Sequence, residues 1–134
     1  MNDQWVQDFI DALHGLEEGR DAGPLLAQFA PDAGVWNVAL HEPLRGEEGA
    51  RRFWEGYRQQ FGRIHSTFER VIVGTDEGAL EWQAEGTLAQ GGREITYRGV
   101  TILKRGEAGI TEFAGYYDPR PFLDGLGVVV QRAA

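Results

Sequence analysis

The sequence predicts an α+β fold: a curved antiparallel β-sheet wrapped around three N-terminal helices, forming a cone with an internal apolar pocket. Helical periodicity is confined to the residues before Gly62, extended segments follow it, and glycine-rich turns separate those segments. Helices followed by a strand meander are typical of a segregated α+β domain. A strongly twisted sheet has a concave face that helices do not fill, and the remaining space is the expected ligand site. The whole chain, residues 1–134, is expected to form one domain.

Three helices are predicted before the long strands. The first lies around Trp5 to Leu16, because apolar residues recur there at three- and four-residue spacing, and Gly19 can end it. A second, shorter helix is expected over Pro24–Phe29, with proline at a favourable first position. The third is expected over Glu47–Phe61, where an aromatic stripe follows two glutamates that suit a helix N-terminus.

Extended segments make up the rest of the predicted fold. A short strand over Asp32–Val38 is followed by a connection containing His41, where Pro43 disfavours helix at the residue before it. In the tail, Val128–Val130 could add an edge strand or contact a partner subunit. After Gly62, alternating patterns predict four strands joined as hairpins: Ile64–Val73, Ala79–Leu88, Glu94–Lys104 and Ile110–Asp118.

Composition argues against several classes of function. The formal net charge of -8 and the lack of clustered Lys and Arg argue against a nucleic-acid partner. The chain has no cysteine, which excludes disulfides, thiolate nucleophiles and thiolate metal sites. The N-terminal segment contains acids and no long apolar run, so it predicts neither a signal peptide nor a membrane span. We expect a soluble cytoplasmic protein without a membrane partner.

Two stretches of sequence resemble a known superfamily. The run Phe29–Asn37, followed by Glu42–Gly46 and a helix containing Phe53 and Trp54, resembles the nuclear transport factor 2-like superfamily, especially its ketosteroid isomerase and SnoaL-like polyketide cyclase branches. The stretch Ile110–Pro119 is similar to the last strand of SnoaL-like proteins, where an aromatic pair precedes an aspartate. The superfamily includes cyclases, isomerases, epoxide hydrolases, transport factors and binding proteins, so the resemblance implies a fold without settling a function.

The ketosteroid isomerase resemblance implies three catalytic groups: a carboxylate base, a tyrosine and a protonated aspartate. The base position falls on Asn37, whose amide cannot abstract a proton near neutrality. The tyrosine position falls on Phe9, which has no hydroxyl, and the aspartate position falls on Val100. We therefore expect that this chain does not use the proton shuttle of ketosteroid isomerase.

Three other side chains are candidates for chemistry. Asp118 ends the last predicted strand, where the resemblance to SnoaL-like cyclases implies an acid for proton transfer; alternatively it caps the turn into Pro119. His41 could serve as acid or base at the pocket mouth, or it is an exposed loop residue. Arg98 would hold a carboxylate or enolate if it faced inward, or it forms a cross-strand pair with a surface glutamate.

Aromatic side chains dominate the candidate binding set. About half of Trp36, Trp54, Tyr57, Trp82, Phe113 and Tyr117 are expected to touch a ligand, and the others to be core. The predicted binding residues also include Asn37, Arg98 and Val100, although the pattern does not decide which face of the third long strand lines the pocket. No metal and no cofactor are expected, because the three histidines are scattered over a helix, a loop and a strand.

The leading hypothesis is a SnoaL-like protein that binds a small apolar molecule, polycyclic or carbonyl-bearing, with cofactor-free acid/base chemistry of the cyclase or isomerase type. The alternative is a non-catalytic ligand-binding or dimeric assembly module of the same fold. A homodimer through the outer sheet face is expected in either case, because apolar residues on both faces of the sheet would otherwise leave an exposed patch.

Overall fold

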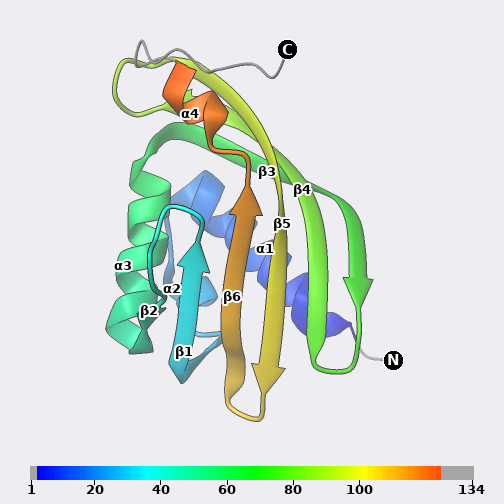
Figure 1. Cartoon of the computed structure of the whole chain (residues 1–134). Helices are drawn as coiled ribbons and strands as arrows, with labels where there is room; N and C mark the ends of the chain where they lie inside the picture. Colours follow the sequence, from blue (N-terminus) through cyan, green and yellow to red (C-terminus); the bar gives the residue numbers. More distant parts are fainter. Residues whose placement is uncertain (1–2, 125–134) are drawn as a thin grey trace.

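The computed structural model describes residues 3–124 and confirms the predicted fold class. Figure 1 shows a curved, open sheet with helices α1, α2 and α3 gathered on one side of it. The elements in chain order are α1 (Gln4–Gly19), α2 (Gly23–Leu26), β1 (Phe29–Asn37), β2 (Leu44–Arg45), α3 (Gly46–Gln59), β3 (Phe61–Val73), β4 (Glu77–Leu88), β5 (Glu94–Gly106), β6 (Gly109–Tyr117) and α4 (Arg120–Asp124).

Helix α1 has the amphipathic pattern that the sequence predicts. Its buried stripe includes Phe9, Leu13 and Leu16, which recur at three- and four-residue spacing. The helix ends at Gly19, and Arg20 follows in the left-handed conformation with φ 61°. The Arg20 N–H donates to the Leu16 carbonyl 2.9 Å away, which satisfies one of the last helical acceptors.

Two predicted helix ends are displaced. Phe29 and Phe61 were expected to close the second and third helices, but α2 ends at Leu26 and α3 at Gln59. Both phenylalanines instead begin strands, β1 and β3, with their rings buried. A buried phenylalanine fits the apolar stripe of a helix or the inner face of a strand, so spacing alone cannot distinguish the two.

The sheet has the strand order β2-β1-β6-β5-β4-β3. The four strands after α3 form the predicted antiparallel meander, whereas β1 pairs with β6 in parallel. This parallel pair joins the first and last strands within residues 3–124, so it brings the residues at the end of β1 beside those of β6. Helix α4 was not predicted, and the expected extended segment Val128–Val130 lies outside the described residues.

The core consists of two apolar clusters on the inner face of the sheet. The larger cluster joins α1 and α3 to β1 and β6 through Phe9, Val35 and Trp54. The smaller cluster centres on Phe61 and Tyr97, near the other end of the sheet. None of the helices within residues 3–124 is long and apolar enough to cross a membrane.

Candidate functional site

A cavity of about 50 Å³ lies between the inner face of the sheet and helices α1 and α3. Apolar and aromatic side chains form most of its wall: Leu13, Phe53, Trp54, Phe68, Trp82, Phe113 and Phe122. Gly115 on β6 contributes only backbone to this wall. The polar side chains of the lining are Asn37, Tyr57, Gln60, Ser66, Tyr97, Thr101 and Tyr117.

Helix α4 contributes the end wall of the cavity. The Phe122 ring packs against those of Tyr97 and Tyr117, with centroids 4.7 and 5.8 Å away. From the turn between β4 and β5, Arg93 Nη2 donates to the Pro121 and Phe122 carbonyl oxygens at 2.9 and 3.4 Å. The segment after β6 is thereby fastened across the end of the sheet.

Six of the nine predicted binding residues line this cavity. They are Asn37, Trp54, Tyr57, Trp82, Phe113 and Tyr117. The other three, Trp36, Arg98 and Val100, are absent from the lining and lie on the outer face of the sheet.

The strand alternation of β5 explains where Arg98 and Val100 lie. Tyr97 and Thr101 are buried on the inner face, so the residues between them at positions 98 and 100 point outward. The Arg98 guanidinium donates to the Glu69 carboxylate on β3. This is the pair with a surface glutamate that was the alternative to an inward-facing Arg98. Trp36 likewise faces outward and donates its indole N–H to the Leu40 carbonyl at 2.8 Å.

The two predicted catalytic side chains lie outside the cavity. The exposed Asp118 carboxylate accepts hydrogen bonds from the Arg120 backbone N–H and from its guanidinium, at 2.6 to 3.0 Å. These bonds hold the pKa of Asp118 below its usual value. This arrangement matches the turn-capping alternative. His41 is exposed in the loop between β1 and β2, so neither side chain touches the cavity.

The three residues at the ketosteroid isomerase positions, Asn37, Phe9 and Val100, lie in different parts of the structure. Asn37 lines the cavity, and its Oδ1 accepts from the Ala39 N–H at 2.9 Å. Phe9 is wholly buried in the core, and Val100 faces outward. These positions do not form a catalytic group in this chain.

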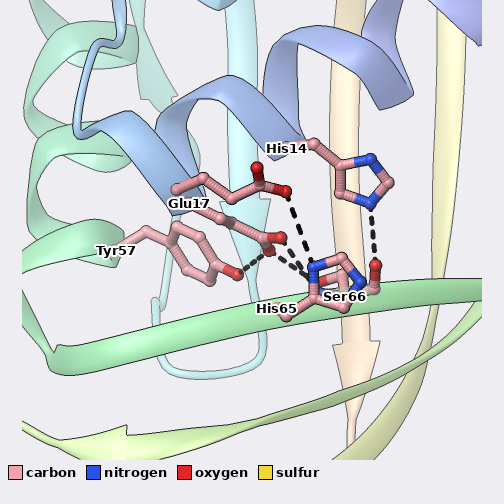
Figure 2. A network of polar contacts seen from close by, with 6 residues as sticks. His14, Glu17, Tyr57, His65 and Ser66 are labelled. Carbon is pink, nitrogen blue, oxygen red and sulfur yellow. Dashed lines mark hydrogen bonds and ion pairs between the residues drawn. The ribbon is translucent and has the colours of Figure 1, made fainter.

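Sequence reasoning missed a buried carboxylate behind the cavity wall. Glu17 on α1 is 1% exposed. Figure 2 shows how its side chain reaches Tyr57 from α3 and Ser66 from β3. The Tyr57 hydroxyl donates to Glu17 Oε2 at 2.7 Å, the Ser66 hydroxyl to the same oxygen at 2.6 Å, and the Ser66 N–H to Oε1 at 2.9 Å. Three donors thus compensate the burial of the charge.

A sequence signal for Glu17 exists. It stands four residues after Leu13, which places it on the apolar stripe of α1 rather than on the solvent face. A carboxylate at such a position must find donors or cost several kcal/mol, so it marks a buried polar network. The predicted stripe stopped at Leu16 and did not include it.

The tyrosines of the lining remain protonated near neutral pH. Burial, followed by the neighbouring Tyr97 and the Glu17 charge, raises the pKa of Tyr57 well above its ordinary value. Burial also raises the pKa of Tyr97 and of Tyr117. These phenols therefore act as hydrogen-bonding groups and not as bases.

A pair of histidines lies next to this network. The His14 and His65 rings stack with centroids 5.0 Å apart, and His14 Nε2 donates to the Ser66 carbonyl at 2.8 Å. Ligand atoms of His14, Glu17 and His65 lie within 4.8 Å of one another, so these residues are the candidate group for a metal ion within residues 3–124. Both Glu17 oxygens already accept hydrogen bonds, and stacked rings do not direct their lone pairs to one point. The expectation of no metal stays a prediction.

Comparisons with solved structures support the fold of the chain. A proposed isomerase from Rhodopseudomonas palustris superposes with a TM-score of 0.82 at 18% identity, covering 96% of this chain and 100% of that one. A proposed SnoaL-like polyketide cyclase from Jannaschia sp. CCS1 has a TM-score of 0.79 at 16% identity, covering 95% and 92%. A protein of ketosteroid isomerase-like fold from Catenulispora acidiphila, in complex with trimethylamine, has a TM-score of 0.78 at 17% identity, covering 100% of both chains.

Sequence comparison identifies the family. No curated protein sequence matches the chain. The family model of the SnoaL-like domain matches residues 6–113, which include most of α1, all of α3 and most of the sheet. The chain therefore belongs to the SnoaL-like domain family.

Proposed function

We propose that this protein binds a small, largely apolar molecule carrying one polar group in the cavity beneath the sheet. The observation that carries this proposal is the composition of the cavity wall. Aromatic rings surround most of the space, and the lining residues Tyr57 and Ser66 bond to the same oxygen of Glu17, with Tyr97 next to Tyr57. Apolar walls with a few convergent polar groups are the usual form of small-molecule sites.

The cavity volume favours a small ligand over a polycyclic one. Sites for drug-sized ligands commonly measure roughly 300–1,000 Å³. The cavity here measures about 50 Å³. The related structure from Catenulispora acidiphila contains trimethylamine, a molecule of this smaller class. A larger ligand would require the Phe122 ring to move away from Tyr97.

Binding without turnover has more support than acid/base catalysis by Asp118, His41 or Arg98. Asp118 is held by Arg120, His41 is exposed, and Arg98 is paired with Glu69 on the outer face. A catalytic group must reach the reacting atom directly or through one water. We therefore assign the cavity a binding role and give these three residues no part in it.

Filling the cavity should weaken ligand binding while leaving the fold intact. A Cβ at Gly115 would lie 3.4 Å from the Phe113 ring and 3.5 Å from Asn37, which is ordinary contact, so Gly115→Val directs its methyl groups into free space. In a heteronuclear NMR titration, the Gly115→Val variant should bind cyclopentanol at least about tenfold more weakly than the wild type does. The reason is that losing the space for the ligand costs roughly 1.4 kcal/mol of binding free energy or more.

The matched control is Thr96→Val, which introduces the same side chain at an exposed position on the outer face of β5. Its affinity for cyclopentanol should equal that of the wild type. Equal binding by the Gly115 variant, with an unchanged fold by NMR, would place the ligand elsewhere.

We also propose that a second copy of this chain covers the outer face of the sheet. Directly paired residues form an apolar row across five strands: Trp36, Ala114, Ile102, Ala79 and Ile72. Helices α1, α2 and α3 lie on the other side of the sheet (Figure 1). Ile72 is 63% exposed, and the ion pairs Arg70–Glu81 and Lys104–Glu112 flank the row. An apolar centre with a polar rim is typical of a dimer interface.

Light scattering after gel filtration is expected to give the mass of a dimer for the wild type. Ile102→Glu places a charge in the centre of the outer row and should shift the mass to that of a monomer, since an unpaired buried charge is strongly disfavoured. Thr67→Glu, at an exposed position of β3, should remain dimeric. A monomeric wild type at high concentration contradicts the proposal.

A further inference from the structure

The polar side of the cavity is organised by Glu17, although Glu17 does not line the cavity itself. Its Oε2 accepts hydrogen bonds from the hydroxyl groups of Tyr57 and Ser66, with oxygen–oxygen distances of 2.7 and 2.6 Å. Each hydroxyl has a single proton to donate, and each of these is committed to the same oxygen of Glu17. What Tyr57 and Ser66 can offer a ligand is therefore the lone pairs of their oxygens.

We propose that Glu17 makes the cavity selective for a ligand with a hydrogen-bond donor, an alcohol, phenol or amine, over a ligand with only an acceptor, such as a ketone. This inference rests on the proposed function and specifies the ligand class. It differs from the carbonyl-bearing ligand expected from the sequence. A donor group can bond to the oxygens of Tyr57 and Ser66, whereas a carbonyl oxygen can bond to neither of them and must find its donor elsewhere on the wall, as at Tyr97.

The charge of Glu17 acts in the same direction. Within residues 3–124, no Lys, Arg or His forms an ion pair with this carboxylate at 4.0 Å or less. The hydrogen bonds to its charge come from neutral donors, and the Arg58 cation interacts with it only beyond ion-pair distance, so the field at the cavity wall next to Glu17 remains negative. Such a field attracts the positive end of an O–H or N–H bond and repels a carbonyl oxygen.

The remaining polar groups of the cavity are compatible with a hydroxyl ligand. The Thr101 hydroxyl oxygen accepts the Trp82 indole N–H at 3.0 Å. Tyr97, which interacts with Tyr57, keeps its own proton because burial raises its pKa. An alcohol can accept from Tyr97 and donate to Tyr57 at once, while a ketone can only accept. The alcohol thus forms more hydrogen bonds with the cavity wall than the ketone does.

A matched set of probes tests this inference. Cyclopentanol, cyclopentanone and methylcyclopentane have similar size and shape but differ in hydrogen-bonding group. Heteronuclear NMR titration of the full chain should give cyclopentanol at least about tenfold higher affinity than cyclopentanone. Equal affinities for the three probes would overturn the selectivity and leave the proposed function standing. Binding of none of them would overturn both, and a preference for the ketone would overturn the inference alone.

Glu17→Gln tests the assignment to Glu17. The glutamine oxygen can accept the Ser66 N–H, while its amide donates to Ser66 Oγ or Tyr57, so that a hydroxyl proton is released toward the cavity. The preference for cyclopentanol should fall to about threefold or less. Glu85→Gln makes the same change at an exposed position of β4 and should keep the full preference.

Tyr57→Phe provides a second route if the Glu17 variant does not fold. It removes one of the two acceptor oxygens and leaves the Ser66 contacts with Glu17 in place. Cyclopentanol should bind at least about threefold more weakly, and methylcyclopentane should bind as it does to the wild type. A purely structural role for Glu17 would change all three affinities together, and that result would overturn the assignment.

Discussion

Replacing Trp54 by alanine is expected to lower the free energy of unfolding by about 3–5 kcal/mol, the range for removing a large aromatic side chain from a core. Trp54 is 2% exposed and lies where α3 meets the sheet. Its ring contacts those of Phe53 and Phe113 with centroids 4.9 and 4.8 Å away, in edge-to-face geometry. The void would open beside the cavity, whose walls are fixed by several strands and cannot collapse easily.

Urea unfolding followed by circular dichroism measures this loss. The control is Trp36→Ala, which removes the same side chain from the outer face, where Trp36 is half-buried and donates one hydrogen bond to Leu40. Its cost should be about 1–2 kcal/mol, since less area and one hydrogen bond are lost. Equal losses for the two variants would mean that α3 does not pack against the sheet as described.

Gly86→Ala should lower the free energy of unfolding by about 3 kcal/mol, because the close approach of two strands leaves no room for a side chain. A Cβ at Gly86 would overlap the Arg63 carbonyl oxygen and would lie 2.9 Å from the Ile64 Cα. Both are backbone atoms, at the register shift between Phe61 and Ile64 where β3 bends. The strands would have to separate, which would also disturb the cavity wall at Ser66.

Gly56→Ala is the matched control, and it should change the free energy of unfolding in the opposite direction. Gly56 lies inside α3, and a Cβ there would meet nothing within 4 Å. Alanine should raise the free energy of unfolding by about 0.5–1 kcal/mol, since it reduces the backbone entropy lost on folding. Thermal unfolding of both variants measures the difference. A Gly86 variant as stable as the wild type would contradict the strand geometry described.

The sequence was sufficient to predict the fold because its periodicities are clear. The stripe of α1 and the alternation of Leu80, Trp82 and Ala84 on β4 each indicate one buried face, and the structure buries these residues. Helix ends were less certain, since Phe29 and Phe61 suit both a helix stripe and the inner face of a strand. The parallel pairing of β1 with β6 is a tertiary contact that no local pattern encodes.

The candidate site was predictable only in part. The aromatic lining followed from alternation, but β5 has apolar residues on both faces, so the outward position of Arg98 and Val100 required the sheet itself. Whether Asp118 faces the cavity depends on Arg120 two residues later, whose guanidinium folds back on the carboxylate. Glu17 was missed because its partners Tyr57 and Ser66 lie 40 and 49 residues away in the chain.

Helix α4 gives the protein a replaceable end wall. The segment touches the cavity through Phe122, and Arg93 holds it to the β4–β5 turn by two backbone carbonyls. Main-chain acceptors are present in every residue, so this fastening tolerates other side chains at positions 121 and 122. The longest ligand that fits could therefore be altered by changing a short segment after β6, while the polar wall and the sheet stay as they are. If the cavity binds a ligand as we propose, the size and the chemistry of that ligand are set by separate parts of one small fold.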